Sequence, residues 1–189
     1  MSGNLNPKND VMWDDNPIDV TSDANFIWSI ANKLRGTYMP DKYGDVIIPM
    51  TILRRLECAL APTKDAVVTL YESNPVLPAL KLERTAGFQF YNTSHYTLKE
   101  LQNETDKLAE NFINYIEGFS ANVQDIMKQL KLAEHIKTMD DGGCLLTVVK
   151  AFSELDLDPA TYDSIKMGYI FENLSKSLLH PLTISPSSL

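Results

Sequence analysis

The positive charge of this chain is concentrated in one short stretch. Between residues 33 and 55, five basic side chains outnumber two acidic ones, whereas the whole chain of 189 residues has a net charge of -8. Cationic side chains neutralise nucleic-acid phosphates or dock on acidic protein surfaces. The predicted DNA or partner contacts are Lys33, Arg35, Lys42, Arg54 and Arg55.

Aromatic residues accompany this basic segment. Tyr38 and Tyr43, with Trp28 close by in sequence, are candidates for stacking on bases, although aromatic residues at helix edges more often belong to the core. Arg54 and Arg55 would point about 100° apart on a helix, so the two cannot share one narrow contact. Each arginine therefore keeps three interpretations: a phosphate contact, a subunit contact or a structural role.

The patterns of common catalytic and metal sites do not occur in the sequence. His95, His135 and His180 are far apart, and none lies at i,i+4 spacing from another histidine or a cysteine. There is no glycine-rich phosphate loop, serine elbow or Cys–His signature. Cys58 and Cys144 lie in apolar runs and are predicted to be buried free thiols. We therefore expect no catalytic residue and no metal in this chain.

Composition indicates an ordinary globular protein. Hydrophobic residues make up 44% and charged residues 22% of the chain, which suits one domain with its own core. No apolar run approaches the length of a membrane span, and the polar, acidic N-terminus is unlike a signal peptide. We expect a cytoplasmic protein without membrane contact.

Periodic apolar residues predict an all-α fold, a compact array of about seven to nine helices with short links. Residues 79–96 are expected to form a helical turn or two and a short extended piece, and "TLKE" at 97–100 matches a capping box. The other predicted helices lie in residues 22–36, 45–61, 63–73, 106–119, 120–130, 132–139, 144–156 and 158–179.

Local signals suggest several helix ends. Gly36 suits a left-handed stop to the first helix. Asp45 is the predicted cap of the second helix. Because proline is tolerated only near the first turn, this helix is expected either to start close to Pro49 or to bend there. Asp158 followed by Pro159 predicts the start of the last helix.

A longer pattern surrounds the basic segment. The run "FIWSIANKLRG…YGDVIIPMTILRRLECAL" is followed by "GFQFYNTSHYTLKEL", "AENFINYIEGFSANVQDIM", "LLTVVKAFSELDLDP" and "MGYIFENL". This series resembles the start of the modification (M) subunit of type I restriction–modification systems. In that family it forms an N-terminal helical domain, which precedes an adenine-N6 DNA methyltransferase domain. The expected organisation is an arm at 1–21, this domain at 22–174 and an atypical tail at 175–189.

The resemblance implies both partners and a cofactor. The partners are a DNA-specificity (S) subunit, a second M subunit, a restriction subunit and double-stranded DNA. The cofactor, S-adenosylmethionine, belongs to the methyltransferase domain, whose glycine cluster and Asn-Pro-Pro-Phe/Tyr motif do not occur here. "NPI" at 16–18 and "NPV" at 74–76 lack the second proline and the aromatic residue. The chain alone is therefore not expected to be an enzyme or to bind a cofactor.

Three hypotheses follow for the function. In the first, the basic segment contacts DNA phosphates within the assembled methyltransferase. In the second, it docks on the specificity subunit or the methyltransferase domain without touching DNA. In the third, the chain is an inactive truncated product, since a cloned fragment, a truncation or a frameshift would each explain the departure from the family after residue 174.

Overall fold

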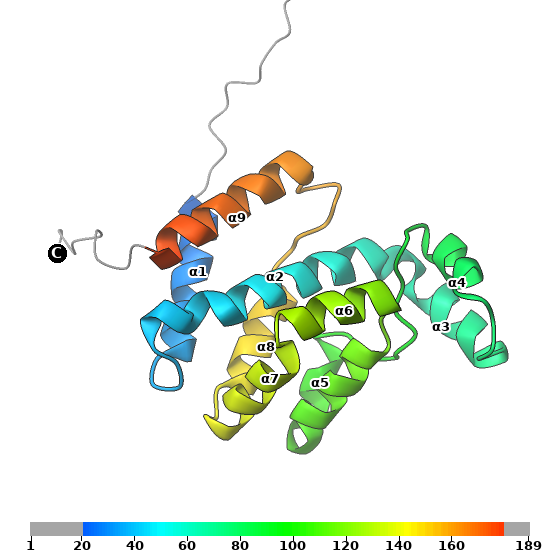
Figure 1. Cartoon of the computed structure of the whole chain (residues 1–189), viewed down its shortest axis with the longest axis horizontal. Coiled ribbons are helices and arrows are strands. Elements are labelled where there is room, and N and C mark those ends of the chain that lie inside the picture. Colours follow the sequence, from blue (N-terminus) through cyan, green and yellow to red (C-terminus); the bar gives the residue numbers. More distant parts are fainter. Residues whose placement is uncertain (1–20, 180–189) are drawn as a thin grey trace, which may run out of the picture.

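Helices account for nearly all regular structure in the computed structural model, which describes residues 21–179 (Figure 1). Within that range β-structure is limited to two isolated bridges, so the prediction of an all-α fold is confirmed. The nine α-helices of the described range are α1 Thr21–Leu34, α2 Tyr43–Leu60, α3 Lys64–Ser73, α4 Ala79–Ala86, α5 Leu108–Glu117, α6 Ala121–Gln129, α7 Leu132–Asp141, α8 Leu145–Glu154 and α9 Ser164–Leu179. Short 3-10 turns occupy Pro40–Lys42, Ala61–Thr63, Glu100–Asn103 and Thr105–Lys107.

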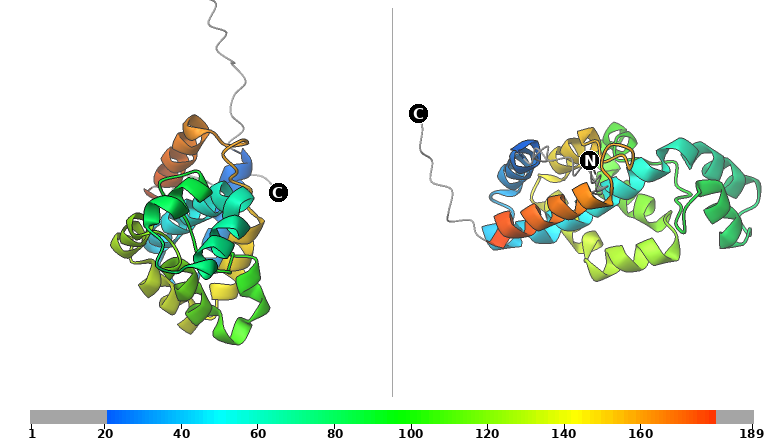
Figure 2. Two further views of the ribbon diagram at one scale, coloured as in Figure 1. Left: turned by 90° about the vertical axis from the view of Figure 1, so that its right-hand side faces the viewer. Right: turned by 90° about the horizontal axis from the view of Figure 1, so that it is seen from above.

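Helix α2 is the central element. It packs against α1, α7, α8 and α9, while α3 and α4 pair at the end of the molecule opposite α1 (Figure 1). Helix α9 packs against α1 and α2, and the view from above in Figure 2 shows it running alongside α2. No helix in residues 21–179 is long and apolar enough to cross a membrane.

The core forms where the apolar faces of these helices meet. From α2, the side chains of Val46, Ile47, Met50 and Leu53 are fully buried. Burial of each such side chain contributes about 1.5–3 kcal/mol of hydrophobic free energy. Large aromatic side chains from α5 and α8 belong to the same buried cluster, namely Phe112, Tyr115 and Phe152.

The predicted start of the second helix is wrong. Helix α2 begins at Tyr43, directly after the 3-10 turn Pro40–Lys42, and Lys42 holds the capping position. Asp45 instead lies in the first turn, where its negative charge suits the helix dipole. Pro49 is buried inside the helix, six residues after its start, so a start beside the proline is excluded. The preceding 3-10 turn explains the early start, because it already sets helical backbone angles.

The predicted start of the last helix is also wrong. Asp158 accepts a hydrogen bond from the backbone N–H of Ala160 and forms a local turn. Asp163 takes the capping role, because its Oδ1 accepts from the N–H groups of Ile165 (3.0 Å) and Lys166 (2.9 Å). Helix α9 then runs from Ser164 to Leu179, across the expected boundary at 174.

Other local predictions have mixed outcomes. Gly36 has the expected left-handed backbone, with φ +91°. Thr97 accepts from the N–H of Glu100 at 3.2 Å, but the turn that follows is 3-10 and helix α5 begins only at Leu108. The predicted arm at 1–21 lies outside the described residues, except for Thr21 at the start of α1.

Candidate nucleic-acid or subunit interface

The basic segment contains a tight turn between α1 and α2. The carbonyl oxygen of Leu34 accepts from the N–H groups of Thr37 (3.1 Å) and Tyr38 (3.0 Å). Gly36 provides the left-handed residue that this reversal needs, and nothing lies within 4 Å of the position that a Cβ would take. The turn thereby pairs Arg35 with Tyr38 in an isolated β-bridge.

Contacts with α7 anchor this turn. The hydroxyl of Tyr38 donates to the carbonyl oxygen of His135 (3.2 Å) and lies 3.1 Å from Nδ1 of the same residue. The hydroxyl of Thr37 donates to the carbonyl oxygen of Gly142 (3.5 Å). Burial raises the pKa of Tyr38 and lowers the pKa of His135, so both groups favour their neutral forms at neutral pH. Tyr38 is therefore an anchoring residue in this structure, and its stacking on a base stays a prediction.

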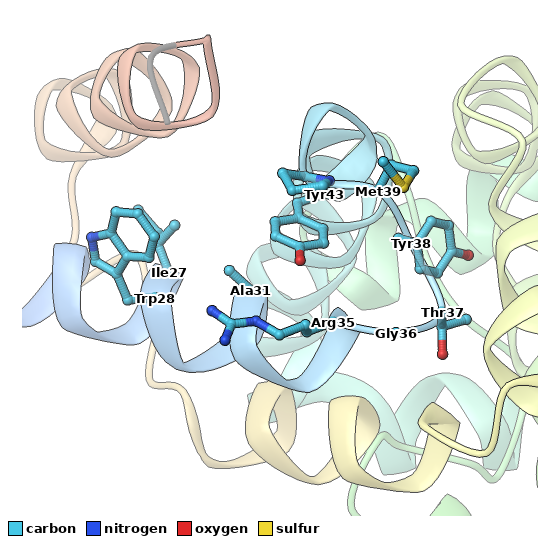
Figure 3. A pocket seen from close by; sticks show the side chains of 10 residues that line it. Ile27, Trp28, Ala31, Arg35, Gly36, Thr37, Tyr38, Met39 and Tyr43 are labelled. Carbon is cyan, nitrogen blue, oxygen red and sulfur yellow. The ribbon is translucent and has the colours of Figure 1, made fainter. Parts of the chain in front are cut away.

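An apolar groove opens beside the turn (Figure 3). Its volume is about 560 Å³, and it lies between α1, the turn and the start of α2. Tyr43 forms part of its wall but is only 9% exposed, which favours a core role over base stacking. Trp28 and Met39 are 39% and 70% exposed, so the groove presents apolar surface to solvent. The lining residues are Ile27, Trp28, Ala31, Arg35, Gly36, Thr37, Tyr38, Met39, Pro40 and Tyr43.

Three of the predicted cations lie around this corner of the molecule. Arg35 is exposed, lines the groove and donates to Asn32 Oδ1 at 3.1 Å. Lys42 is exposed and lies 3.7 Å from a carboxylate oxygen of Asp45. Lys33 is half-buried and lines a separate depression between α1 and α8. The structure thus brings Arg35 and Lys42 to the two ends of the α1–α2 turn and places Lys33 on the α8 side.

The adjacent arginines of α2 make internal hydrogen bonds. Arg54 donates through Nε to the carbonyl oxygen of Leu155 (2.7 Å), and Arg55 donates through Nη1 to that of Leu157 (2.8 Å). Both bonds tie α2 to the segment that follows α8. The structural interpretation of the two arginines thus has direct support, and their contact with DNA or a partner stays a prediction.

Glu57 is the centre of a buried polar network that the sequence analysis missed. It forms an ion pair with Arg54 and accepts hydrogen bonds from the N–H of Leu98 (2.8 Å) and the hydroxyl of Tyr115 (2.6 Å). Burial, and then the charge of Glu57, raise the pKa of Tyr115 well above its usual value, which keeps the phenol protonated. The i,i+3 spacing of Arg54 and Glu57 was a usable signal for this pair.

Lys64 lies beside the same network. Its Nζ donates to Asn92 Oδ1 (2.8 Å) and to the carbonyl oxygen of Tyr96 (3.2 Å), and it lies 5.5 Å from the centre of the Tyr115 ring. Burial lowers the pKa of Lys64 to about 8, and the charge of Glu57 opposes this shift. In residues 21–179 no group of three or more His, Cys, Asp or Glu side chains is placed to hold a metal ion.

Comparison with known proteins identifies the family. The HsdM N-terminal domain profile matches residues 24–152, which is more than half of the chain. The chain belongs to this family. Its members are N-terminal domains of the M subunit of type I restriction–modification methyltransferases, so the predicted resemblance is confirmed. No curated protein and no solved structure matches the chain.

The part of the chain matched by the HsdM N-terminal domain extends from α1 into α8. It therefore contains the whole basic segment, the groove and the Arg54–Glu57 pair, whereas α9 lies beyond it. The HsdM assignment connects this domain with a methyltransferase subunit of a type I complex.

Proposed function

We propose that this chain engages DNA and supports subunit assembly as the N-terminal domain of a type I adenine-N6 methyltransferase. Its partners in this proposal are the specificity subunit, a second M subunit and the restriction subunit, with double-stranded DNA held between them. S-adenosylmethionine and the catalytic residues belong to the methyltransferase domain of such a subunit. The chain described here would itself hold neither, and it would act in the cytoplasm.

The observation that carries this proposal is an exposed basic corner, formed by Arg35 and Lys42, within a domain of the HsdM family. Arg35 and Lys42 flank one rigid turn, and both are exposed. Lys33 lies on the neighbouring surface of α1. Cations presented in this way can neutralise phosphates and position DNA without reading its sequence. Arg54 and Arg55 contribute indirectly, because their bonds to the segment after α8 help to fix the position of α2.

The test is DNA binding by the reconstituted complex of specificity subunit and M subunits. We expect Arg35→Ala combined with Lys42→Ala to weaken binding. Each lost phosphate contact should also reduce the slope of log K against log salt by about 0.9. A matched control is Lys81→Ala combined with Arg84→Ala, which removes two exposed cations from α4 at the opposite end of the molecule (Figure 1).

The DNA proposal is contradicted if the two double variants bind DNA with equal affinity and with an equal salt slope. An assembled complex is a condition of this comparison, so its composition is measured by size-exclusion chromatography first. If the Arg35 and Lys42 variant fails to assemble while the α4 control assembles, the surface contacts a subunit instead.

That second outcome describes the alternative function, a protein-interaction module that docks on the specificity subunit without DNA contact. One observation favours it: the surface beside Arg35 is an apolar groove with exposed Trp28 and Met39. Exposed apolar patches are typical of protein contacts, whereas DNA interfaces are more polar and more cationic.

The third hypothesis is an inactive truncated product, which would neither assemble nor bind DNA in either experiment.

A further inference from the structure

The groove between α1 and α2 leaves apolar surface uncovered around one cation. Trp28 and Met39 are 39% and 70% exposed on its rim, and Arg35 is exposed in its wall (Figure 3). Its volume of about 560 Å³ accommodates several apolar side chains. Such a surface suits an apolar segment that carries negative charge, because apolar burial and attraction to the arginine then act together.

The residues that precede α1 have this chemistry. Residues 1–20 contain four aspartates and one lysine, a side-chain charge of -3. Within them, the run Val11-Met12-Trp13-Asp14-Asp15 places three apolar side chains directly before two carboxylates. This run is covalently joined to the groove by a short connection, because residues 1–20 lead directly into α1 and α1 forms one of the groove walls.

The length of the connection is sufficient. Seven residues lie between Trp13 and Thr21, so the connection has eight residue steps. At about 3.3 Å per step an extended chain spans about 26 Å in total. Along α1 the rise of about 1.5 Å per residue puts Trp28 about 10 Å and Arg35 about 21 Å from Thr21. A segment that turns back along α1 therefore reaches the whole groove. Covalent attachment through a short linker also gives it an effective concentration in the millimolar range.

We propose that the segment Val11–Trp13 docks in this groove, with Asp14 or Asp15 paired with Arg35. The docked segment covers Trp28 and Met39 and neutralises a cation of the basic corner. If the DNA or partner contact proposed above is made by Arg35, the segment must leave before that contact forms, and this consequence rests on the proposed function. The docking itself does not, and it is tested on the isolated chain without DNA or a partner.

Tryptophan fluorescence provides the test, because the chain has only two tryptophans, Trp13 and Trp28. In a Trp28→Phe background Trp13 is the only reporter. We expect acrylamide to quench Trp13 severalfold less in this protein than in a peptide of residues 8–20. Adding Arg35→Glu and Met39→Glu should raise quenching to the value of the peptide. The matched control adds Arg84→Glu and Leu80→Glu on α4, which should leave Trp13 protected.

A variant of the segment keeps the test independent of the folding of the groove variant. Asp14→Asn with Asp15→Asn changes no residue of the described fold and should increase the quenching of Trp13. The proposal is overturned if Trp13 is quenched as readily as in the peptide, or if the groove variant and the α4 control give equal protection. Protection that is lost on dilution also overturns it, since the segment then occupies the groove of a second copy.

Discussion

Glu57→Gln is the perturbation whose effect the structure defines most sharply. One carboxylate oxygen of Glu57 accepts a hydrogen bond from Arg54. The other accepts hydrogen bonds from the backbone N–H of Leu98 and the hydroxyl of Tyr115. An amide replaces one of these oxygens by a donor. If its NH₂ group faces Arg54, two donors oppose each other. If the NH₂ group faces Leu98, it lies opposite the backbone N–H of Leu98, a second donor whose direction is fixed by the chain. Either orientation leaves one buried donor without an acceptor.

The cost follows from burial and charge. The side chains of Arg54 and Glu57 are only 17% and 9% exposed. Removing one partner of such a buried pair costs about 3–5 kcal/mol, and an unpaired buried donor costs about 1–3 kcal/mol. Arg54 retains its bond to the carbonyl oxygen of Leu155 and some contact with water. We therefore expect the lower end of the first range, a loss of about 3 kcal/mol in the free energy of unfolding.

Urea unfolding followed by circular dichroism measures this loss. With a slope of about 2 kcal/mol per molar urea, the midpoint should fall by about 1.5 M. Glu110→Gln on the exposed side of α5 is the control and should change stability by less than about 0.5 kcal/mol. A double-mutant cycle with Arg54→Met should give a coupling of at least about 1 kcal/mol. Equal stability of the two Gln variants, or an additive cycle, would refute the reasoning.

Four further predictions concern packing and protonation. Gly118→Ala places a Cβ 2.7 Å from Cβ and 2.8 Å from N of Ser94 and should cost about 1–3 kcal/mol. Gly168→Ala in α9 meets nothing within 4 Å and should raise stability by about 0.5–1 kcal/mol; thermal unfolding compares the two. Because the pKa of Lys64 is lowered to about 8 by burial, the unfolded chain binds more protons between about 8 and 10.5. Urea unfolding should therefore show that the stability difference between the wild type and Lys64→Met shifts in favour of the wild type from about pH 7.5 to 9.5. Burial likewise lowers the pKa of His135, so stability should fall as pH decreases through about 6.5, and less so in His135→Gln.

Sequence periodicity was sufficient to predict the helices, but not where two of them begin. Asp158 and Asp163 are both aspartates with capping chemistry, and the proline after Asp158 favoured the wrong one. Which carboxylate caps the helix depends on the path of the chain from α8, and local sequence does not encode that path. At α2, a 3-10 turn before Tyr43 supplies helical geometry early, so Pro49 lies inside the helix instead of at its start.

Only part of the candidate site was predictable from the sequence. Charge segregation led to Arg35 and Lys42, which the structure places on an exposed turn. The same signal included Arg54 and Arg55, whose acceptors are backbone carbonyls 101 and 102 residues away in sequence. No local pattern indicates an acceptor at that separation. The groove was also beyond reach, because its walls combine α1 with the turn and the start of α2.

The most direct test of the central claim, that the basic corner contacts DNA in the assembled methyltransferase, is site-specific photocrosslinking. A photoreactive amino acid is placed at position 35 or 42, with position 84 on α4 as the control, and the complex with specificity subunit and labelled DNA is irradiated. We predict DNA adducts from positions 35 and 42 and none from position 84. Adducts to a protein subunit alone, or equal DNA adducts from all three positions, would contradict the account.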